Sequence, residues 1–322
     1  MLMLTCQGQL GNQMFQYAAT RTLAEQRGFS MACRGERPTW RERIRRLLGR
    51  PRRGNPLYLR RFFRLEGDSV WRNGMNRLFW ACRPDLPRRR YSDRYTEVLP
   101  ETWVQTVDPD FVRLADGTEI CAWLQATNYC QHNRGRVRDW FRLRSPYQER
   151  LDGLMARLGR PAQQLCCVHV RRGDYLTADC GFAHADTGWA LPLDYYRRAL
   201  SLLPDGLHHV LISDDPDWAQ TAFDWLPSMQ VSRGEPQVVD MFLLTRCRYN
   251  VIANSSFSWW GAYLNETPGR VVIAPAYHLG WSKRVWNPQG IRVDGWTYVE
   301  ALAGDSPKHR GNRGCTEASM SP

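Results

Sequence analysis

The fold class of this chain is decided by residues 164–175, Gln164-Leu165-Cys166-Cys167-Val168-His169-Val170-Arg171-Arg172-Gly173-Asp174-Tyr175. The first part is an apolar, β-prone run that is typical of a buried strand. Two guanidinium groups, a glycine and a carboxylate follow it directly. Ligands of open α/β sheets bind beyond the carboxyl ends of strands, and arginine can hold a diphosphate through a bidentate fork. The stretch therefore predicts a phosphate-binding loop in which Gly173 allows a sharp turn and Asp174 braces one arginine. The alternative is a solvated loop with incidental charges.

The second half of the chain alternates between β-prone runs and helical patterns. The pattern predicts strands at 164–170, 208–213, 228–232, 249–253 and 270–274. It predicts helices at 193–203, 216–226, 237–247 and 257–266. Strands that alternate with helices through short links indicate a parallel, doubly wound sheet.

The N-terminal segment predicts a second Rossmann-like unit. A strand over Leu2 to Cys6 leads through the glycines Gly8 and Gly11 into a helix, with Asn12 as its N-cap and an end near Arg27. The glycines do not follow GxGxxG, so this is not a dinucleotide fingerprint. A strand over Glu119 to Gln125 and helices near 128–142 and 146–159 complete this half.

The expected fold is therefore α/β, with two Rossmann-like doubly wound halves and a cleft between them. The N-terminal half spans 1–159 and carries an arginine-rich insertion at about 34–94, which we interpret as helices and loops. The C-terminal half spans 160–303, and the segment Gly159-Arg160-Pro161 links the two halves. Residues 304–322 are rich in Gly, Ser, Pro and Arg and predict a disordered tail.

Composition agrees with this expectation. The 322 residues carry a formal charge of +12, which suits anionic partners such as nucleotide diphosphates, nucleic acid or an acidic membrane face. Ten cysteines occur without a CxxC pair or zinc spacing, as expected of reduced core thiols in a reducing compartment. No apolar run approaches the roughly 18 residues of a membrane span, and no signal peptide is visible. A cytoplasmic protein is expected.

Two further motifs stand far from residues 164–175. One is Gly8-Gln9-Leu10-Gly11-Asn12-Gln13-Met14-Phe15, and the other is Asn254-Ser255-Ser256-Phe257-Ser258-Trp259-Trp260-Gly261. The three motifs in this order resemble glycosyltransferase family 11, the α-1,2-fucosyltransferases, in their bacterial form. The likeness covers roughly residues 2 to 275 and is weakest over 34–115. It implies a GT-B-like fold in which 1–159 is the acceptor-side half and 160–303 is the GDP-fucose-binding half.

This resemblance implies an inverting, metal-independent transfer of L-fucose from GDP-β-L-fucose to the 2-hydroxyl of a terminal galactoside, in glycan or O-antigen synthesis. It assigns Arg171 to the departing diphosphate and brings His169 and Asp240 toward the guanine base. A carboxylate there can accept hydrogen bonds from the guanine N1–H and N2 amine. The resemblance also brings Gly8, Gly11 and Asn12 to the diphosphate, the fucose or the acceptor.

Two serines that follow a predicted strand are expected to form an anion-binding site, because of their hydroxyl groups and their position. Ser255 and Ser256 open a helix, where hydroxyl groups and free N–H groups attract a phosphate. Simple N-capping explains the same residues without a ligand. The aromatic residues Phe257, Trp259 and Trp260 are expected to pack this helix into the core.

The triplet Asp215-Pro216-Asp217 is formally an Asp-x-Asp pattern that could hold manganese. Proline at the first helical position instead predicts a capping motif, and Asp214 or Asp215 could orient the arginines. We expect no metal and no other cofactor. A general base is not resolved among Asp174, His184, Asp186 and Asp194, and an oxocarbenium-like transition state reduces the need for one.

The arginine-rich segment leaves two alternatives to a plain solvated surface. Arg37 to Arg64 contains many arginines and almost no acids, so it could contact the anionic inner face of the membrane, where lipid-linked glycans serve as acceptors. It could also bind RNA, because Trp40, Tyr58 and Trp71 interleave with its arginines, although no known nucleic-acid fold is present. A sugar-nucleotide-binding protein without catalysis is the remaining alternative. Overall we expect a glycan acceptor and no nucleic acid.

Overall fold

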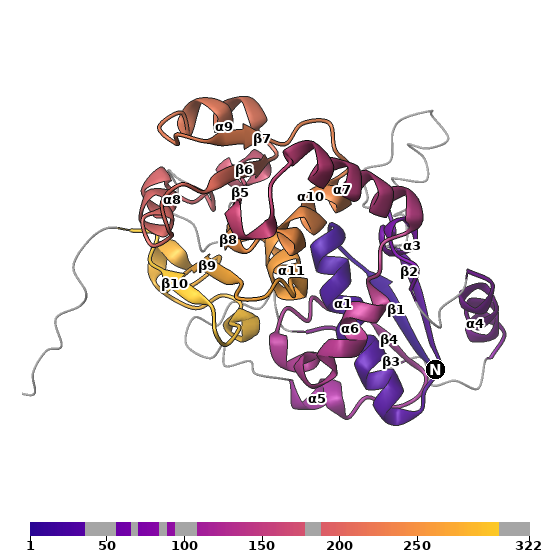
Figure 1. Cartoon of the computed structure of the whole chain (residues 1–322). Coiled ribbons are helices and arrows are strands. Elements are labelled where there is room, and N and C mark those ends of the chain that lie inside the picture. Colours follow the sequence, from indigo (N-terminus) through magenta and orange to yellow (C-terminus); the bar gives the residue numbers. More distant parts are fainter. Residues whose placement is uncertain (36–55, 66–69, 84–88, 94–107, 178–187, 303–322) are drawn as a thin grey trace, which may run out of the picture.

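The computed structural model describes residues 1–35, 56–65, 70–83, 89–93, 108–177 and 188–302, which form two parallel sheets (Figure 1). The N-terminal sheet has the strand order β2-β1-β4-β3. Its strands are β1 (Leu2–Cys6), β2 (Met31–Gly35), β3 (Arg89–Tyr91) and β4 (Thr118–Ile120). All neighbours are parallel, so the carboxyl ends of these strands share one edge.

The C-terminal sheet has the order β10-β9-β8-β5-β6-β7. Its strands are β5 (Leu165–Val170), β6 (His208–Ser213), β7 (Met229–Val231), β8 (Tyr249–Val251), β9 (Val271–Pro275) and β10 (Thr297–Val299). Counted from β5 this is the 3-2-1-4-5-6 order of the nucleotide-binding Rossmann fold. The direction of winding reverses between β5 and β8, so their carboxyl ends flank the crevice where such folds bind ligands.

Helices cover both faces of the C-terminal sheet, which is why β5 is buried along its whole length. Leu165 and Cys167 face one core with α10 (Gln237–Leu243) and α11 (Ser256–Leu264), against which α7 (Ser145–Leu158) also packs. Cys166 and Val168 face the opposite core with α8 (Leu193–Leu200) and α9 (Pro216–Ala222). The alternation of these residues along one strand produces the two-sided winding.

The N-terminal half is organised around α1 (Leu10–Arg27), a long and largely buried helix that ends at Gly28 in a left-handed conformation. Its other helices are α3 (Leu59–Phe62), α4 (Val70–Cys82), α5 (Pro109–Val112) and α6 (Arg134–Trp140). Short 3-10 turns occur at 127–129, 131–133, 162–164, 173–176, 244–246, 281–283 and 289–291. In Figure 1, α4 lies at the edge of the molecule, outside β2.

Most sequence predictions of elements are confirmed, with differences of a few residues at their ends. The five predicted strands of the C-terminal half and its four helices are all present. The strand predicted over 119–125 is shorter, because only Thr118–Ile120 pairs with its neighbours. The strands β2, β3 and β10 were not predicted. The predicted tail and much of the insertion at 34–94 lie outside the described residues, and the domain division at 159/160 stays a prediction.

Two global predictions concern cysteines and membrane spans. All eight cysteines in the described parts of the chain are free thiols, and seven of them are buried. Over the same parts, no helix combines the length and apolarity needed to cross a bilayer.

The two halves meet where α1 packs on α11 (Figure 1). The ring of Phe15 lies 4.5 Å from that of Trp259 and 4.9 Å from that of Trp260, centroid to centroid. The indole of Trp260 donates a hydrogen bond of 2.9 Å to the carbonyl oxygen of Gly11. These contacts form one apolar core that both halves share.

Gly11 is the point of closest approach between the halves. A Cβ at this position would lie 2.6 Å from the carbonyl carbon of Ser256 and 2.8 Å from the nitrogen of Phe257. Both atoms belong to backbone and cannot move away alone, so only glycine fits here.

Gly11→Ala should therefore lower the free energy of unfolding by about 1–3 kcal/mol, because the added methyl group forces the two helices apart. Urea denaturation measures this change. Gly153→Ala in α7 is the matched control, since its methyl group would meet only the Arg157 side chain at 3.7 Å. The control should gain about 0.5–1 kcal/mol. Equal stability of the two variants would contradict the argument.

Candidate functional site

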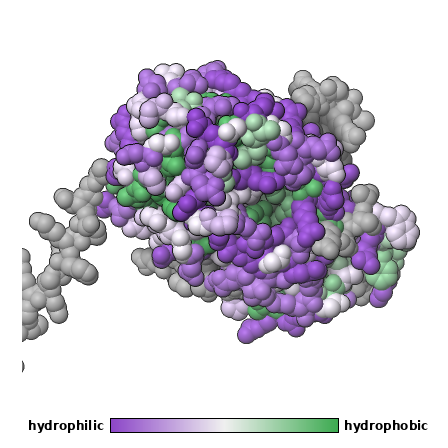
Figure 2. Space-filling model, in the orientation of Figure 1, coloured by the Kyte–Doolittle hydropathy of each residue, from purple (hydrophilic) through white to green (hydrophobic). Residues whose placement is uncertain are grey.

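A cavity of about 720 Å³ lies at the carboxyl ends of the strands, and residues of both halves line it. Its size falls within the range of small-molecule sites. All nine residues predicted for the site line this one cavity: Gly8, Gly11, Asn12, His169, Arg171, Asp174, Asp240, Ser255 and Ser256. Figure 2 shows hydrophilic residues over most of the visible face, with hydrophobic residues in the hollow between the two halves.

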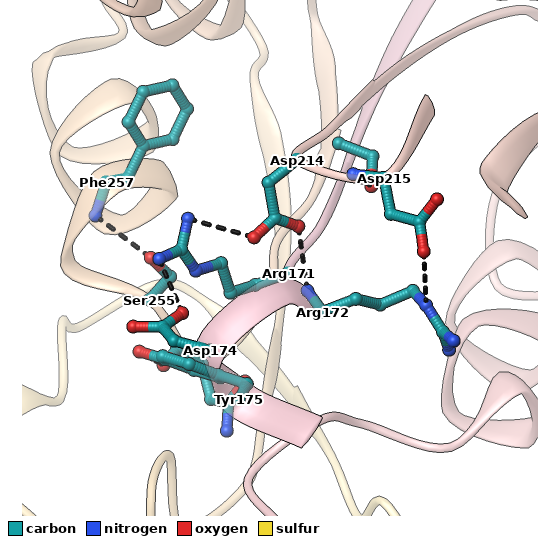
Figure 3. Close-up of polar contacts among 10 residues, drawn as sticks. Arg171, Arg172, Asp174, Tyr175, Asp214, Asp215, Ser255 and Phe257 are labelled. Atoms are coloured by element: carbon teal, nitrogen blue, oxygen red, sulfur yellow. Dashed lines mark hydrogen bonds and ion pairs between the residues drawn. The ribbon is translucent and has the colours of Figure 1, made fainter. Parts of the chain in front are cut away.

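Two carboxylates hold the guanidinium of Arg171 at the end of β5 (Figure 3). Its Nη2 donates to Oδ1 of Asp174 at 2.6 Å, and its Nη1 lies 3.1 Å from Oδ2 of Asp214. The predicted bracing by Asp174 is therefore confirmed, and Asp214 adds a second brace from the end of β6. The guanidinium has a fixed position in the cavity wall, as an anion-binding group requires.

The neighbouring Arg172 has a different environment. Its guanidinium lies 3.7 Å over the ring of Trp218 and pairs with Asp215 at 3.3 Å, and it does not line the cavity. Gly173 begins the 3-10 turn Gly173–Leu176, so the chain turns sharply at this position as predicted. A Cβ there would lie 2.5 Å from Oδ2 of Asp214, so Gly173 leaves room for the carboxylate that holds Arg171.

The start of α11 joins the two halves through polar groups. Ser255 is the N-cap, and its Oγ accepts a 3.3 Å hydrogen bond from the Phe257 nitrogen. The hydroxyl of Ser256 donates to Oδ1 of Asn12 at 2.7 Å. Oδ1 of Asn12 also accepts from Nε2 of Gln125 at 2.7 Å.

Asn12 is thus not the N-cap of α1. The N-cap is Gln9, and the side chain of Asn12 in the first turn turns toward Ser256 instead. The prediction failed because a capping residue and a cavity-lining residue look alike in sequence. Gly8 before this helix has φ +66°, and a Cβ there would lie 2.9 Å from the Trp123 ring. Both helices α1 and α11 therefore direct their positively polarised N-termini toward the cavity.

Asp240 lies half-buried in the first turn of α10 and accepts a 2.6 Å hydrogen bond from the hydroxyl of Ser232. Burial raises the pKa of its carboxyl to about 7, against the effect of the Ser232 bond, and the charge of Glu235 adds to the rise. Glu235 itself is occupied by Arg150 and Arg157, at 2.5 and 2.8 Å. Of these two carboxylates, that of Glu235 is paired with arginines, whereas that of Asp240 has only the Ser232 hydroxyl as a partner among the described residues.

His169 and Phe257 form an aromatic wall, with ring centroids 4.9 Å apart. Burial, and to a lesser extent the charge of Arg171, lowers the pKa of His169 to about 3, so the imidazole is neutral. The expectation that Trp259 and Trp260 pack into the core is confirmed. Phe257 packs against the same core as a half-buried side chain, and it also lines the cavity.

The Asp215-x-Asp217 pattern is a helix cap. Oδ1 of Asp215 accepts from the Trp218 nitrogen at the start of α9, and Asp217 pairs with Arg233 at the surface. Among the described residues, no group of three His, Cys, Asp or Glu side chains is placed to hold a metal ion.

The four predicted candidates for a general base differ in their position relative to the cavity. Asp174 lines the cavity beside Arg171. Asp194 does not line it, and its carboxylate lies exposed beside Arg197 at 3.6 Å. His184 and Asp186 fall outside the described residues.

Several cavity residues were not predicted from sequence. They come from loops that follow β4 and β9 or that precede α8, where sequence carries little periodic signal: Trp123, Gln125, Trp189, His278, Leu279 and Asn287. The one feature of the sequence that could have indicated them is their place in the chain, because most of them follow the carboxyl end of a strand.

Comparison with known proteins bears on this site. A family model described as glycosyl transferase family 11 matches residues 125–300. The O-antigen biosynthesis glycosyltransferase WbnK of Escherichia coli is 36% identical over 136 residues, which cover 40% of this chain and 42% of that protein. An alpha-1,2-colitosyltransferase of Escherichia coli is 33% identical over 34% of this chain and 39% of its own length. The chain thus matches less than half of the length of these two relatives.

A longer match and a solved structure extend the comparison. The galactoside 2-alpha-L-fucosyltransferase SEC1 of Bos taurus is 26% identical over 94% of this chain and 75% of its own. A crystal structure of POFUT1 in complex with GDP aligns with a TM-score of 0.52 and 10% identity, over 85% of this chain and 97% of that one. At this identity the likeness concerns the fold alone, which is GT-B-like as predicted. The chain belongs to glycosyltransferase family 11.

Proposed function

We propose that this protein transfers L-fucose from GDP-β-L-fucose to the 2-hydroxyl group of a terminal galactoside, with inversion and without a metal ion. The acceptor would be a galactose-terminated oligosaccharide or a lipid-linked glycan of O-antigen synthesis. The observation that carries the proposal is the guanidinium of Arg171, fixed in the cavity wall between Asp174 and Asp214 and facing the starts of two helices. The family membership of the chain and the activities for which its relatives are named support it.

A GDP-sugar matches the order of groups along the cavity. Asp240 offers a carboxylate to the guanine N1–H and N2 amine, and His169 with Phe257 offers an apolar edge for the base. Arg171 and the start of α11 at Ser255 lie at the switch point between β5 and β8 and suit the diphosphate.

The reaction breaks the bond between C1 of fucose and the β-phosphate oxygen while the acceptor oxygen forms a new bond to C1 from the opposite side. Negative charge grows on the departing β-phosphate, so a fixed guanidinium and helix N-termini aimed there lower the barrier. The acceptor hydroxyl loses its proton as the new bond forms. Of the predicted base candidates, Asp174 lines the cavity and could receive this proton once the diphosphate has replaced it as the partner of Arg171.

The direct test is to incubate the pure protein with GDP-fucose and a β-galactoside in excess EDTA and to determine the linkage and anomeric configuration of the product. We expect an α-1,2-linked fucosyl product at a rate that added manganese does not change. Transfer from GDP-colitose alone would shift the assignment to the activity of the colitosyl relative. No transfer from any nucleotide sugar, with RNA binding that falls steeply with salt, would favour a nucleic-acid-binding protein instead.

Arg171→Ala should reduce turnover by about 10²–10³-fold, the usual effect of removing one group that stabilises the transition-state anion. Arg171→Lys should restore little, because a point charge does not replace a bidentate fork. Arg136→Ala is the control, since Arg136 is half-exposed and pairs with Glu25 on the surface. Turnover of the Arg171→Ala variant that matches the control would remove Arg171 from the mechanism.

The raised pKa of Asp240 predicts a pH-dependent affinity for GDP-fucose, whose esterified diphosphate does not titrate near neutrality. Guanine binding needs the carboxylate, so the affinity should rise with pH up to about 7 and level off above it. Below that value it should fall by at most about tenfold per pH unit, because binding then displaces one proton. Calorimetric titration between pH 5.5 and 8.5 measures the profile. Asp240→Asn should bind weakly at every pH, and a flat wild-type profile would argue against the contact.

We also propose a peripheral contact with an anionic membrane, through a surface on α4. Its exposed face carries Trp71, Met75, Leu78 and Phe79, a spacing that places all four on one side of the helix. Asn73 and Trp80 hold the opposite side against β2. Figure 2 shows this end of the molecule at its right edge.

Charge supports an anionic lipid surface. α4 also carries the exposed residues Arg72 and Arg77. Arg83 follows the helix, and its guanidinium lies 5.1 Å over the Phe79 ring. Interfacial helices combine such arginines with tryptophan and phenylalanine. Of the arginine-rich stretch from Arg37 to Arg64, only Arg60, Arg61 and Arg64 belong to the described residues.

Sedimentation with liposomes should therefore show binding to anionic vesicles at low salt and weaker binding to neutral ones. Each basic residue near such a surface contributes about 1 kcal/mol. Trp71→Ser with Leu78→Ser should reduce binding without changing turnover on a soluble acceptor. Val112→Ser, at an exposed apolar residue on α5, is the control. Equal binding to both kinds of vesicle, or binding unaffected by the α4 changes, would refute the contact.

A further inference from the structure

One wall of the cavity carries buried polar atoms that have no partner. Three of these atoms are the two ring nitrogens of His278 and the Oδ1 of Asn287. None of the three forms a hydrogen bond with any residue that the structure describes. The two side chains are 5% and 3% exposed, and both line the cavity. Unpaired polar groups at such depth cost free energy, so native proteins rarely keep them without a ligand or water to satisfy them.

The backbone holds these two residues in place. Both belong to the loop between β9 and β10, where the nitrogen of Asn287 donates to the carbonyl oxygen of Tyr277 at 3.3 Å and the nitrogen of Leu279 donates to that of Asn287 at 3.0 Å. The backbone of Tyr277 and His278 has φ angles of +66° and +48°, which residues other than glycine rarely adopt. Such strain persists only where the surroundings fix the conformation, and it concentrates at ligand-binding sites.

The position of this loop along the sheet indicates what it would meet. Asp240 follows β7, Arg171 follows β5, Ser255 follows β8 and His278 follows β9. In the sheet these strands lie in the order β7-β6-β5-β8-β9, so the residues follow one another along its carboxyl edge. If the base lies near Asp240 and the diphosphate between β5 and β8, the group attached beyond the diphosphate lies toward β9.

We propose that His278 and Asn287 form a subsite that binds hydroxyl groups of a hexose, in the first place the sugar ring of the nucleotide-sugar donor. The proposal rests on the proposed function, because it assumes that the cavity holds a nucleotide sugar. Trp189 lines the same cavity, and its indole N–H also has no partner among the described residues. An acceptor hexose presents the same chemistry, and the two sources are separated below.

The state of the imidazole fits this role. Burial lowers the pKa of His278 to about 3, an effect that the backbone of Asn287 only partly offsets. The ring is therefore neutral and has one donor and one acceptor nitrogen. Together with the amide of Asn287 it can both donate to and accept from neighbouring hydroxyl groups. With so low a pKa it is a poor general base, so we assign it to binding and specificity.

The test compares the affinities of His278→Phe and Asn287→Leu for GDP-fucose and for GDP, together with the acceptor KM. Each change removes the polar atoms and keeps the bulk of the side chain. His209→Phe is the matched control, a buried histidine on β6 outside the cavity. Binding of the donor sugar predicts that GDP-fucose affinity falls about 10- to 100-fold while GDP affinity is retained. Binding of the acceptor predicts a raised acceptor KM at unchanged donor affinity.

Equal losses for GDP and GDP-fucose, or no change in either affinity or in the acceptor KM, would overturn the proposal. The unaltered protein provides a second measurement that does not depend on how the variants fold. Among donor and acceptor analogues that each lack one hydroxyl group, at least one should bind about tenfold or more weakly, because it leaves the subsite unpaired. Uniform affinity for all analogues would also overturn it. If the unaltered protein binds neither GDP nor GDP-fucose, the proposed function itself fails, which is a distinguishable result.

Discussion

The close approach of α1 and α11 is the constraint on which the site depends. Gly11 lies against the backbone of Ser256 and Phe257 with no room for a methyl group. This contact brings the N-termini of two helices from different halves to one cavity. It also sets the 2.7 Å hydrogen bond between Ser256 and Asn12. A shift of either helix would separate these groups. The polar arrangement of the cavity therefore depends on the close packing at Gly11.

The second determinant is topology. Because β6 and β8 lie on opposite sides of β5, the chain leaves a crevice at the carboxyl ends of β5 and β8. Arg171 follows one of these strands and Ser255 the other, so residues more than eighty positions apart in sequence face the same space. The strand order thus creates a crevice suited to an anion. Arg171 contributes a guanidinium to this crevice, and Ser255 contributes a hydroxyl group at a helix N-terminus.

The sequence predicted the C-terminal half and the residues around the cavity well, because strands and their following loops carry strong local signals. It failed where the deciding contact is tertiary. Asn12 has the features of an N-cap, yet Ser256 and Gln125 determine its position. Gly173 turns the chain as predicted, but the room that it leaves for Asp214 can be recognised only in the folded chain. His278 has no local signal, because its role depends on unpaired nitrogens in a cavity wall that only the folded chain creates.

The electrostatics of Arg171 distinguish its two carboxylate partners. Asp214 is 25% exposed and also accepts a 2.9 Å hydrogen bond from the Arg172 nitrogen, whereas Asp174 is 61% exposed. A solvated ion pair contributes little free energy, so the pairing with Asp174 is the one that a ligand's diphosphate can replace. Asp214 would then keep the guanidinium oriented while Asp174 is released. Two carboxylates thus fix the position of the guanidinium, and its charge becomes available to the anion when the diphosphate replaces Asp174.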